Sequence, residues 1–349
     1  MPSFPGYSTI FVQSGTAALA LLLIAARLNR PQVESPSVVL PAYGCPDLVT
    51  AAQFAGLRVV LADIHSDDPS FDLSSLGRLL NDQTVAVVAV NFLGLRDRLA
   101  KIRDLLFDFP NVTLVEDNAQ QFPEPGVARL EGDGVCTSFG RGKPVSLLGG
   151  GAAFVRELLL TKEVLHHVRP ARQGGGNLCT KVHLYNQLLR PTLFGLVNRL
   201  PFLKLGRTEF KQLSHIEALD ADRLAILPAN VKRYLERDRS IEKFFRESIP
   251  SDMNLPMMSD RSAGRLLRYP VLCATKKERD VLLHQLTSKG LGASAMYRSA
   301  IPQIPGIPRV EGEWRGAEEF ADRLLTLPLH SGVSIPAAER IRDVIRRLR

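Results

Sequence analysis

The sequence predicts an α/β fold in which a large domain holds a mostly parallel central sheet flanked by helices. Short apolar runs rich in Val, typical of buried strands, recur at Val38–Leu40, Val59–Ile64, Val85–Phe92, Val112–Val115, Val135–Phe139 and Ala152–Val155. Between several of them lie helical patterns, such as Leu73–Leu80 and Asp97–Phe107. Continuous apolar strands that alternate with helices indicate a parallel sheet covered on both faces.

The pattern becomes less regular after about residue 157. Long apolar stretches mix there with Pro191, Pro201 and the run Gly174–Gly176, which predicts helices and loops. Residues Leu213–Ser240 predict a long helix with an interruption at Pro228.

The last third predicts a smaller α+β domain. Its order is helix, strand, helix, strand, helix, with candidate strands at Leu266–Cys273 and Ala293–Tyr297. An amphipathic helix over Ile335–Leu348 follows them. We therefore expect a large domain over residues 1–240 and a small one over residues 241–349.

Composition and charge narrow the class of protein. The chain of 349 residues is 45% hydrophobic and 23% charged, which is ordinary for a soluble globular protein. Its four cysteines form no C-x-x-C pair, so we expect no metal site, no disulfide framework and reduced thiols in the cytoplasm.

No nucleic-acid-binding motif accompanies the formal net charge of +8, so we expect no nucleic-acid partner. The apolar run Ala17–Ala26 is too short to span a bilayer and predicts a buried helix, so no membrane association is expected.

Two polar motifs lie at predicted strand ends, where open α/β sheets usually bind ligands. The segment Ser14–Ala18 precedes an apolar helix, and free N–H groups at such a start attract anions. The segment Glu116–Gln120 closes the strand Val112–Val115 with acidic side chains. Taken alone, the first segment is better explained as a plain helix cap, and the second is also typical of a loop cap.

A third motif follows the strand Val135–Phe139. The chain runs there into a glycine-rich turn, Thr137–Lys143, and the glycines Gly149–Gly151 come soon after. An exposed loop is the usual place of a lysine. Pro144 follows the lysine, which excludes a Walker phosphate-binding loop.

Together the three motifs resemble those of the DegT/StrS family of sugar-nucleotide aminotransferases, in the aspartate-aminotransferase fold class (fold type I). The family's S-G-T-A-A-L stands at Ser14–Leu19, its E-D-x-A-Q at Glu116–Gln120 and its S-F-x-x-x-K at Ser138–Lys143. The resemblance covers nearly the whole chain and is strongest over Gln13–Val155.

The resemblance implies pyridoxal 5'-phosphate as the cofactor, carried as a Schiff base on Lys143. As a neutral amine, Lys143 would also serve as the base for the proton shift. The carboxylate of Asp117 would keep the pyridine nitrogen protonated. Gln120 would lie near the face of the ring or its phenolic oxygen.

The resemblance also implies the remaining cofactor contacts. Gly15, Thr16 and Ser138 would hold the phosphate through N–H and O–H donors. Tyr43 is a candidate to stack on the ring, although the family's aromatic residue often falls two positions later, at Cys45.

The chain departs from the family in three places. Only 13 residues precede the first motif, and the segment missing there usually helps to build the dimer. The family's G-E-G-G reads Leu148–Gly151. Its N-Y-R motif, whose Asn reaches the partner subunit's phosphate, falls near Glu209–Gln212 and lacks that Asn, for which Asn186 is a candidate substitute. These departures bear on the substrate rather than on the cofactor chemistry.

The function implied by the resemblance is transfer of an amino group from glutamate or glutamine to a keto group of a nucleotide-linked sugar, as in polysaccharide biosynthesis. The enzyme would be a cytoplasmic homodimer. Two alternatives stay open: another pyridoxal-phosphate reaction on an amino acid or an unusual biosynthetic intermediate, and a non-catalytic regulatory homologue. Sugar dehydratases of this fold replace the lysine with His, whereas this chain keeps Lys143.

Overall fold

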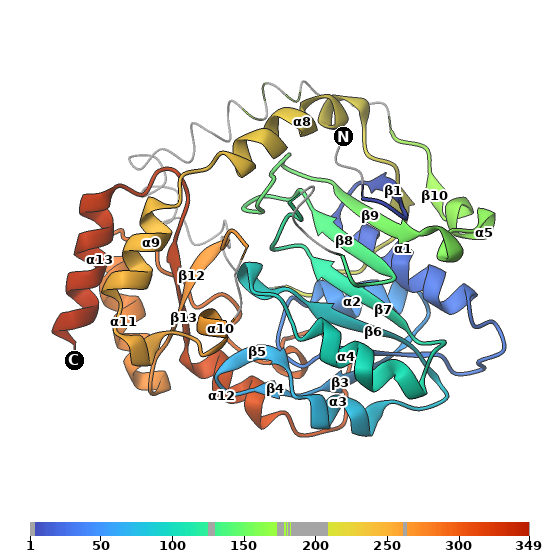
Figure 1. Cartoon of the computed structure of the whole chain (residues 1–349), viewed down its shortest axis with the longest axis horizontal. Helices are drawn as coiled ribbons and strands as arrows, with labels where there is room; N and C mark the ends of the chain where they lie inside the picture. Colours follow the sequence, from blue (N-terminus) through green and yellow to red (C-terminus); the bar gives the residue numbers. More distant parts are fainter. Residues whose placement is uncertain are drawn as a thin grey trace.

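The computed structural model describes residues 4–124, 130–172, 209–260 and 264–348, and the single positions 178, 180 and 182. Its centre is a seven-stranded sheet in the order β1-β9-β8-β7-β6-β2-β3 (Figure 1). The strands of this sheet are β1 (Tyr7–Val12), β2 (Ser37–Pro41), β3 (Arg58–Ala62), β6 (Thr84–Val90), β7 (Thr113–Asn118), β8 (Gly134–Ser138) and β9 (Gly151–Arg156). Neighbours from β3 to β8 pair in parallel, and only β9 runs antiparallel to its two neighbours. The predicted mostly parallel sheet is confirmed.

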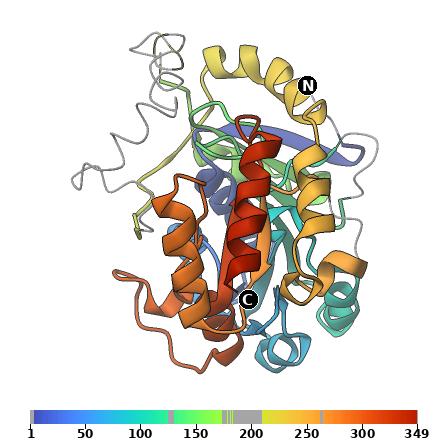
Figure 2. The ribbon, with the colours of Figure 1, turned by 90° about the vertical axis from the view of Figure 1, so that its left-hand side faces the viewer.

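Helices cover both faces of the sheet, which is why the inner strands are apolar along their whole length. The helices of this layer are α1 (Gly15–Leu28), α2 (Asp47–Phe54), α3 (Leu73–Leu79) and α4 (Leu99–Leu105). Successive residues of a strand point to opposite faces: Val38 packs in the cluster that contains α1 and α2, and Val39 packs in the cluster that contains α3 and α4. In Figure 2 the helix next to the C-terminus, drawn in red, lies in front of the central strands.

Several predicted boundaries move in the first half. The edge strand β1 was not predicted, and it pairs antiparallel with β9. The expected strand Val59–Ile64 divides into β3 and the short β4 (Ile64–His65), which pairs with β5 (Asp68–Phe71). Strand β7 extends three residues beyond the predicted Val115, to Asn118. Glu116 and Asp117 therefore lie inside a strand rather than in the loop after it.

The predicted long helix Leu213–Ser240 is wrong at its start. Residues Ile216–Glu217 instead form β11, which pairs with β10 (Val168–Arg169) after the short helix α5 (Lys162–His166). Helix α8 (Ala221–Leu235) begins where the Asp220 side chain accepts a hydrogen bond from the Arg223 N–H, and it continues through Pro228. The residues Gly174–Gly176, Pro191 and Pro201 lie outside the described residues.

The C-terminal third contains a two-stranded antiparallel sheet flanked by helices. Its elements are α9 (Ser240–Ser248), α10 (Met257–Asp260), β12 (Arg268–Leu272), α11 (Lys276–Ser288), α12 (Arg315–Arg323), β13 (Leu324–Pro328) and α13 (Ile335–Arg347). The candidate strand Ala293–Tyr297 is wrong, because it contributes only one bridge, Ser294 to Thr326. The partner of β12 is β13, which was not predicted.

Asp63 ties this C-terminal third to the edge of the central sheet. Its carboxylate accepts hydrogen bonds from the N–H groups of Gly316 and Ala317 at 2.9 and 2.8 Å, at the start of α12. Nearby, the Trp314 indole donates to the carbonyl of Leu61. Within the described residues, no helix combines the length and the apolar character that crossing a bilayer requires.

Candidate active site

One pocket collects the three sequence motifs. It opens at the carboxyl ends of β7 and β8, beside the start of α1, where ligands of open α/β sheets bind. Every predicted site residue except Tyr43 lines it: Gly15, Thr16, Asp117, Gln120, Ser138 and Lys143. Residues far apart in sequence thus line one pocket.

The start of α1 and the end of β8 form a close-packed turn. The Ser14 hydroxyl accepts a hydrogen bond from the Ala17 N–H and begins the helix. A Cβ atom on Gly15 would stand 2.6 Å from the Cβ of Ser138, so only glycine fits there. The N-terminal amides of a 14-residue helix and the Ser138 hydroxyl therefore border one small space, which suits an anion.

The glycines after the lysine hold these two segments together. A Cβ atom on Gly151 would stand 2.6 Å from the carbonyl oxygen of Ser14. Gly150 has a φ of 103°, and its N–H donates to the carbonyl of Gln13. The run Gly149–Gly151 therefore allows the backbone of β9 to lie against the start of α1.

Asp117 is a buried acid whose carboxyl group borders the pocket. Its Oδ1 accepts hydrogen bonds from the Ala119 N–H at 2.7 Å and from the Cys136 Sγ at 3.5 Å. Burial raises the pKa of the Asp117 carboxyl, while the Ala119 N–H and the charge of Lys143 act in the opposite direction. A cationic group bound beside it would relieve the cost of its charge.

Lys143 is half-buried and extends from the loop after β8. The backbone N–H of Lys143 donates to the Gly140 carbonyl, and Gly142 has a φ of 70°. The side chain of Lys143 therefore extends from a tight glycine turn. Among the described residues, no carboxylate lies within 4.0 Å of its ammonium group. The amine is therefore available to a ligand of the pocket.

Gln120 is fixed between two parts of the chain. Its Oε1 accepts from the Leu93 N–H at 2.8 Å, and its Nε2 donates to the Tyr297 hydroxyl at 3.2 Å. Leu93 has a φ of 56°, in a turn that Gly94 continues with a φ of 94°. The amide is thus held in place before any ligand binds.

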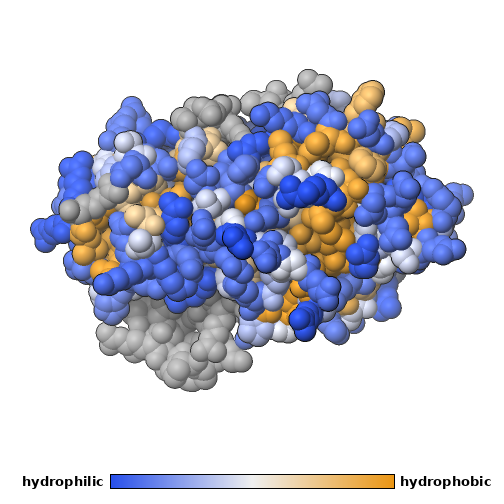
Figure 3. Space-filling model, turned by 90° about the horizontal axis from the view of Figure 1, so that it is seen from below, coloured by the Kyte–Doolittle hydropathy of each residue, from blue (hydrophilic) through white to orange (hydrophobic). Residues whose placement is uncertain are grey.

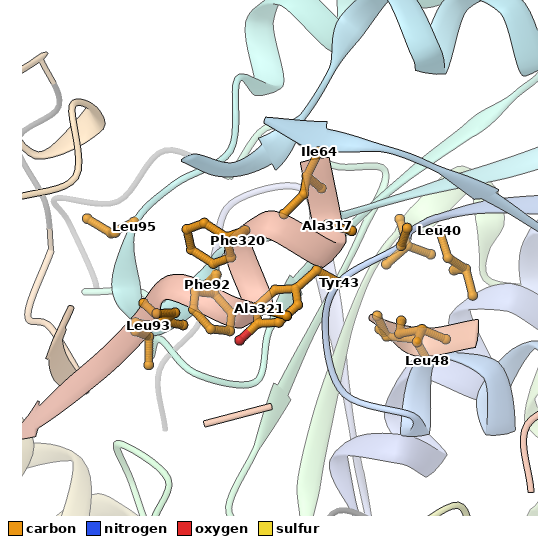
Figure 4. Close-up of a cluster of buried hydrophobic side chains, with 14 of the residues drawn as sticks. Leu40, Tyr43, Leu48, Ile64, Phe92, Leu93, Leu95, Ala317, Phe320 and Ala321 are labelled. Atoms are coloured by element: carbon orange, nitrogen blue, oxygen red, sulfur yellow. The ribbon is translucent and has the colours of Figure 1, made fainter. Parts of the chain in front are cut away.

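Tyr43 lies in the hydrophobic core rather than in the pocket wall, which corrects the sequence-based expectation of ring stacking. Only 2% of it is exposed, and its ring contacts Phe92 and Phe320 with centroids 5.5 and 5.1 Å apart (Figure 4). Its hydroxyl donates to the carbonyl of Tyr297. The residue two positions later, Cys45, lines the pocket instead.

Among the further polar residues of the pocket, the sequence motifs named Cys45 only as the position of the family's aromatic residue, and they missed Asp47, Cys136 and Tyr297. Burial raises the pKa of the Cys45 thiol to about 12, and the charge of Asp47 adds to the effect, so the thiol stays protonated at neutral pH. Burial likewise raises the pKa of the Tyr297 phenol well above its usual value. Tyr297 comes from the C-terminal third, and Met296 before it has a φ of 53°, a feature that no local motif reveals.

A model of the DegT/DnrJ/EryC1/StrS aminotransferase family matches residues 7–349. The chain belongs to this family. The family and the fold class expected from the sequence are thereby confirmed.

Solved structures of similar fold include that of PseC from Helicobacter pylori, an aminotransferase involved in the biosynthesis of pseudoaminic acid. The chain matches it with a TM-score of 0.74 and 17% identity over 97% of this chain and 86% of that one. The PLP form of Spr1654 from Streptococcus pneumoniae matches with a TM-score of 0.70 and 17% identity over 98% and 88%. At this identity the likeness concerns the fold.

The chain is also similar to a GDP-4-keto-6-deoxy-D-mannose 3-dehydratase of Escherichia coli O55:H7. The two are 29% identical over 121 residues, which are 34% of this chain and 31% of that relative. The matches span less than a third of the length of the curated relatives.

Proposed function

We propose that this chain is a pyridoxal-phosphate-dependent aminotransferase that moves an amino group from glutamate or glutamine to a keto group of a nucleotide-linked sugar. The observation that carries the proposal is the meeting of Lys143 and Asp117 in one pocket with the start of α1. Membership of an aminotransferase family supports the reaction class. A relative of the same fold in its PLP form supports the cofactor.

The residues present fit pyridoxal phosphate at its phosphate end. The cofactor's phosphate would lie against the backbone N–H groups at Gly15 and Thr16 and accept from the Ser138 hydroxyl. The space exists because Gly15 lacks a Cβ atom, which would otherwise meet Ser138 at 2.6 Å.

The residues also fit the ring of the cofactor. The buried Asp117 carboxylate would pair with the protonated pyridine nitrogen. Burial raises the pKa of Asp117, and a cationic neighbour would stabilise its charged form. Gln120, clamped by Leu93 and Tyr297, would border the ring. When bound, the cofactor supplies the electron sink for carbanion chemistry.

Lys143 would attach the cofactor covalently and then act as the proton carrier. Its Nζ has no ion-pair partner among the described carboxylates, so it is free to hold and return the proton of the reacting carbon. This lysine favours amino transfer over sugar dehydration, for which the enzymes of this fold carry His at that position.

The positive charge of the chain supports an anionic acceptor substrate. The formal net charge is +8, and two arginines directly follow glycine-loop or pocket residues: Arg141 after Gly140, and Arg298 after Tyr297. Binding of a distant nucleotide diphosphate would orient the keto group in the pocket. The partner-loop Asn expected from the family remains unassigned, because Asn186 lies outside the described residues.

The proposal includes a cytoplasmic homodimer. Seen from below, apolar residues gather on the side of the molecule that holds the central sheet (Figure 3). Contiguous apolar surface of this kind often marks an interface, and twofold dimers are the commonest assemblies.

The reaction is tested with the enzyme loaded in its pyridoxamine form. Stopped-flow spectra are recorded after mixing with a panel of nucleotide-linked ketosugars, the same sugars without nucleotide, and free keto acids. We expect the spectrum of the pyridoxal form to return with one nucleotide-linked sugar and to return slowly with its truncated counterpart. Efficient conversion of small ketones alone would instead support the other pyridoxal-phosphate reaction.

A further inference from the structure

Asp47 is an acid in the cofactor pocket that the proposed chemistry does not use. It begins α2, is half-buried and lines the same pocket as Thr16, Ser138 and Lys143. Its Oδ2 accepts a hydrogen bond from the Thr16 hydroxyl at 2.9 Å. The first turns of α1 and α2 are therefore joined through one carboxylate.

The charge of Asp47 has no cationic partner among the described residues. No Lys, Arg or His nitrogen of those residues lies within 4.0 Å of its carboxylate. Its charge contributes to the raised pKa of Cys45 and to that of Asp117. The negative field of Asp47 thus extends across the pocket.

Asp47 weakens, without abolishing, the fit of a phosphate at the start of α1. The Thr16 hydroxyl has one proton, and donation to Asp47 leaves none for the phosphate. The phosphate would bind backbone N–H groups and Ser138 while a carboxylate lies one hydrogen bond away from Thr16. Two anions at such close range repel strongly in a partly buried site.

We propose that Asp47 is a specificity-determining residue that weakens the hold of this pocket on phosphorylated cofactors. The inference rests on the proposed function, because it takes the phosphate site to be the start of α1. Its consequence is an enzyme that exchanges its cofactor with solution more readily than the same pocket without this charge.

The test is the variant Asp47→Asn, which keeps the shape and the oxygen that accepts from Thr16 but removes the charge. The full-length apoprotein is titrated by calorimetry with pyridoxamine 5'-phosphate, which cannot bond covalently to Lys143. The dissociation constant of Asp47→Asn is expected to fall by about tenfold or more, the size of effect that close charges produce in partly buried sites. Titration with pyridoxamine, which lacks the phosphate, should show no such gain in affinity for the variant, because no phosphate is there for Asp47 to repel.

The matched control is Asp82→Asn, the same chemical change at an exposed residue before β6. It should leave the dissociation constant unchanged, which separates local repulsion from net charge. An unchanged or weaker constant for Asp47→Asn would overturn the inference alone and make Asp47 a support for Thr16. Failure of the wild type to bind either vitamer would overturn the proposed function as well.

A second variant keeps the test decisive if Asp47→Asn does not fold. Thr16→Val removes the hydroxyl that Asp47 occupies. Because this hydroxyl is committed to Asp47, the constant for pyridoxamine 5'-phosphate should change less than threefold. A tenfold loss would show that Thr16 donates to the phosphate and would contradict the inference.

Discussion

The buried carboxyl of Asp117 links cofactor binding to stability. Only 7% of this residue is exposed, and its hydrogen bonds come from one backbone N–H and one thiol. Burying this carboxyl in its charged form lowers the stability of the fold. A cation that binds beside it offsets this loss and so binds more tightly. A residue that is awkward for folding is therefore well suited to binding the ring nitrogen.

This cost predicts a pH-dependent effect of Asp117→Asn on the cofactor-free protein. Because burial raises the folded-state pKa above the ordinary value of 3.8, the folded state holds the proton more tightly than the unfolded state. Wild-type stability should therefore decline as the pH rises from that value through the folded-state pKa, and the variant should not share this decline.

Thermal unfolding from pH 4 to pH 7 measures the difference. The melting temperature of Asp117→Asn should gain on that of the wild type as the pH rises. A constant difference across this range would show that Asp117 is not a destabilising charge in the cofactor-free fold.

Glycines determine how the elements around the pocket approach one another. Helix α1 can start against β8 only because Gly15 has no side chain. Gly151 allows β9 to pass the same point, with a Cβ atom there meeting the Ser14 carbonyl. The pocket thus depends on the packing of elements as much as on its polar side chains.

The variant Gly15→Ala tests this packing. The added methyl group would overlap Ser138, so we expect a loss of about 1–3 kcal/mol in the free energy of unfolding, typical of overpacking. Gly77→Ala in α3 is the matched control, because its Cβ would meet nothing closer than 3.8 Å and alanine favours helices. Chemical denaturation of both variants gives the comparison, and equal stabilities would count against the close contact.

The sequence predicts the elements of the first half well because strand and helix periodicities there are strong. The segments Glu116–Gln120 and Thr137–Lys143 indicate a polar site because they lie at the ends of predicted strands, whereas Ser14–Ala18 is noticed only as the start of an apolar helix. It places Tyr43 wrongly, since an aromatic beside a strand end packs into a core as readily as into a pocket. It misses Tyr297, which reaches the pocket from the C-terminal third and contacts Gln120, 177 residues away in sequence.

At the scale of the whole molecule, the C-terminal third completes the pocket of the first half. Tyr297 lines the pocket. Asp63 accepts hydrogen bonds from the start of α12 and so joins that helix to the edge of the sheet. The proposed division near residue 240 would therefore separate two domains that share one site. In the proposed homodimer, residues of a partner subunit would also contribute to the pocket.

We predict that the proposed homodimer forms and persists in dilute solution. Light scattering coupled to gel filtration should give twice the mass of the 38.5 kDa chain, because apolar surface of the kind seen in Figure 3 is commonly buried between subunits. A monomer with full activity would contradict this assembly.

The central claim is that Lys143 carries the cofactor, and chemical trapping tests it most directly. Wild-type protein and Lys143→Ala are incubated with pyridoxal 5'-phosphate, reduced with borohydride, digested and mapped by mass spectrometry. The account predicts the cofactor adduct on the peptide that contains Lys143 and no stoichiometric adduct in the variant. An adduct on another lysine that persists at full yield in Lys143→Ala would contradict the account.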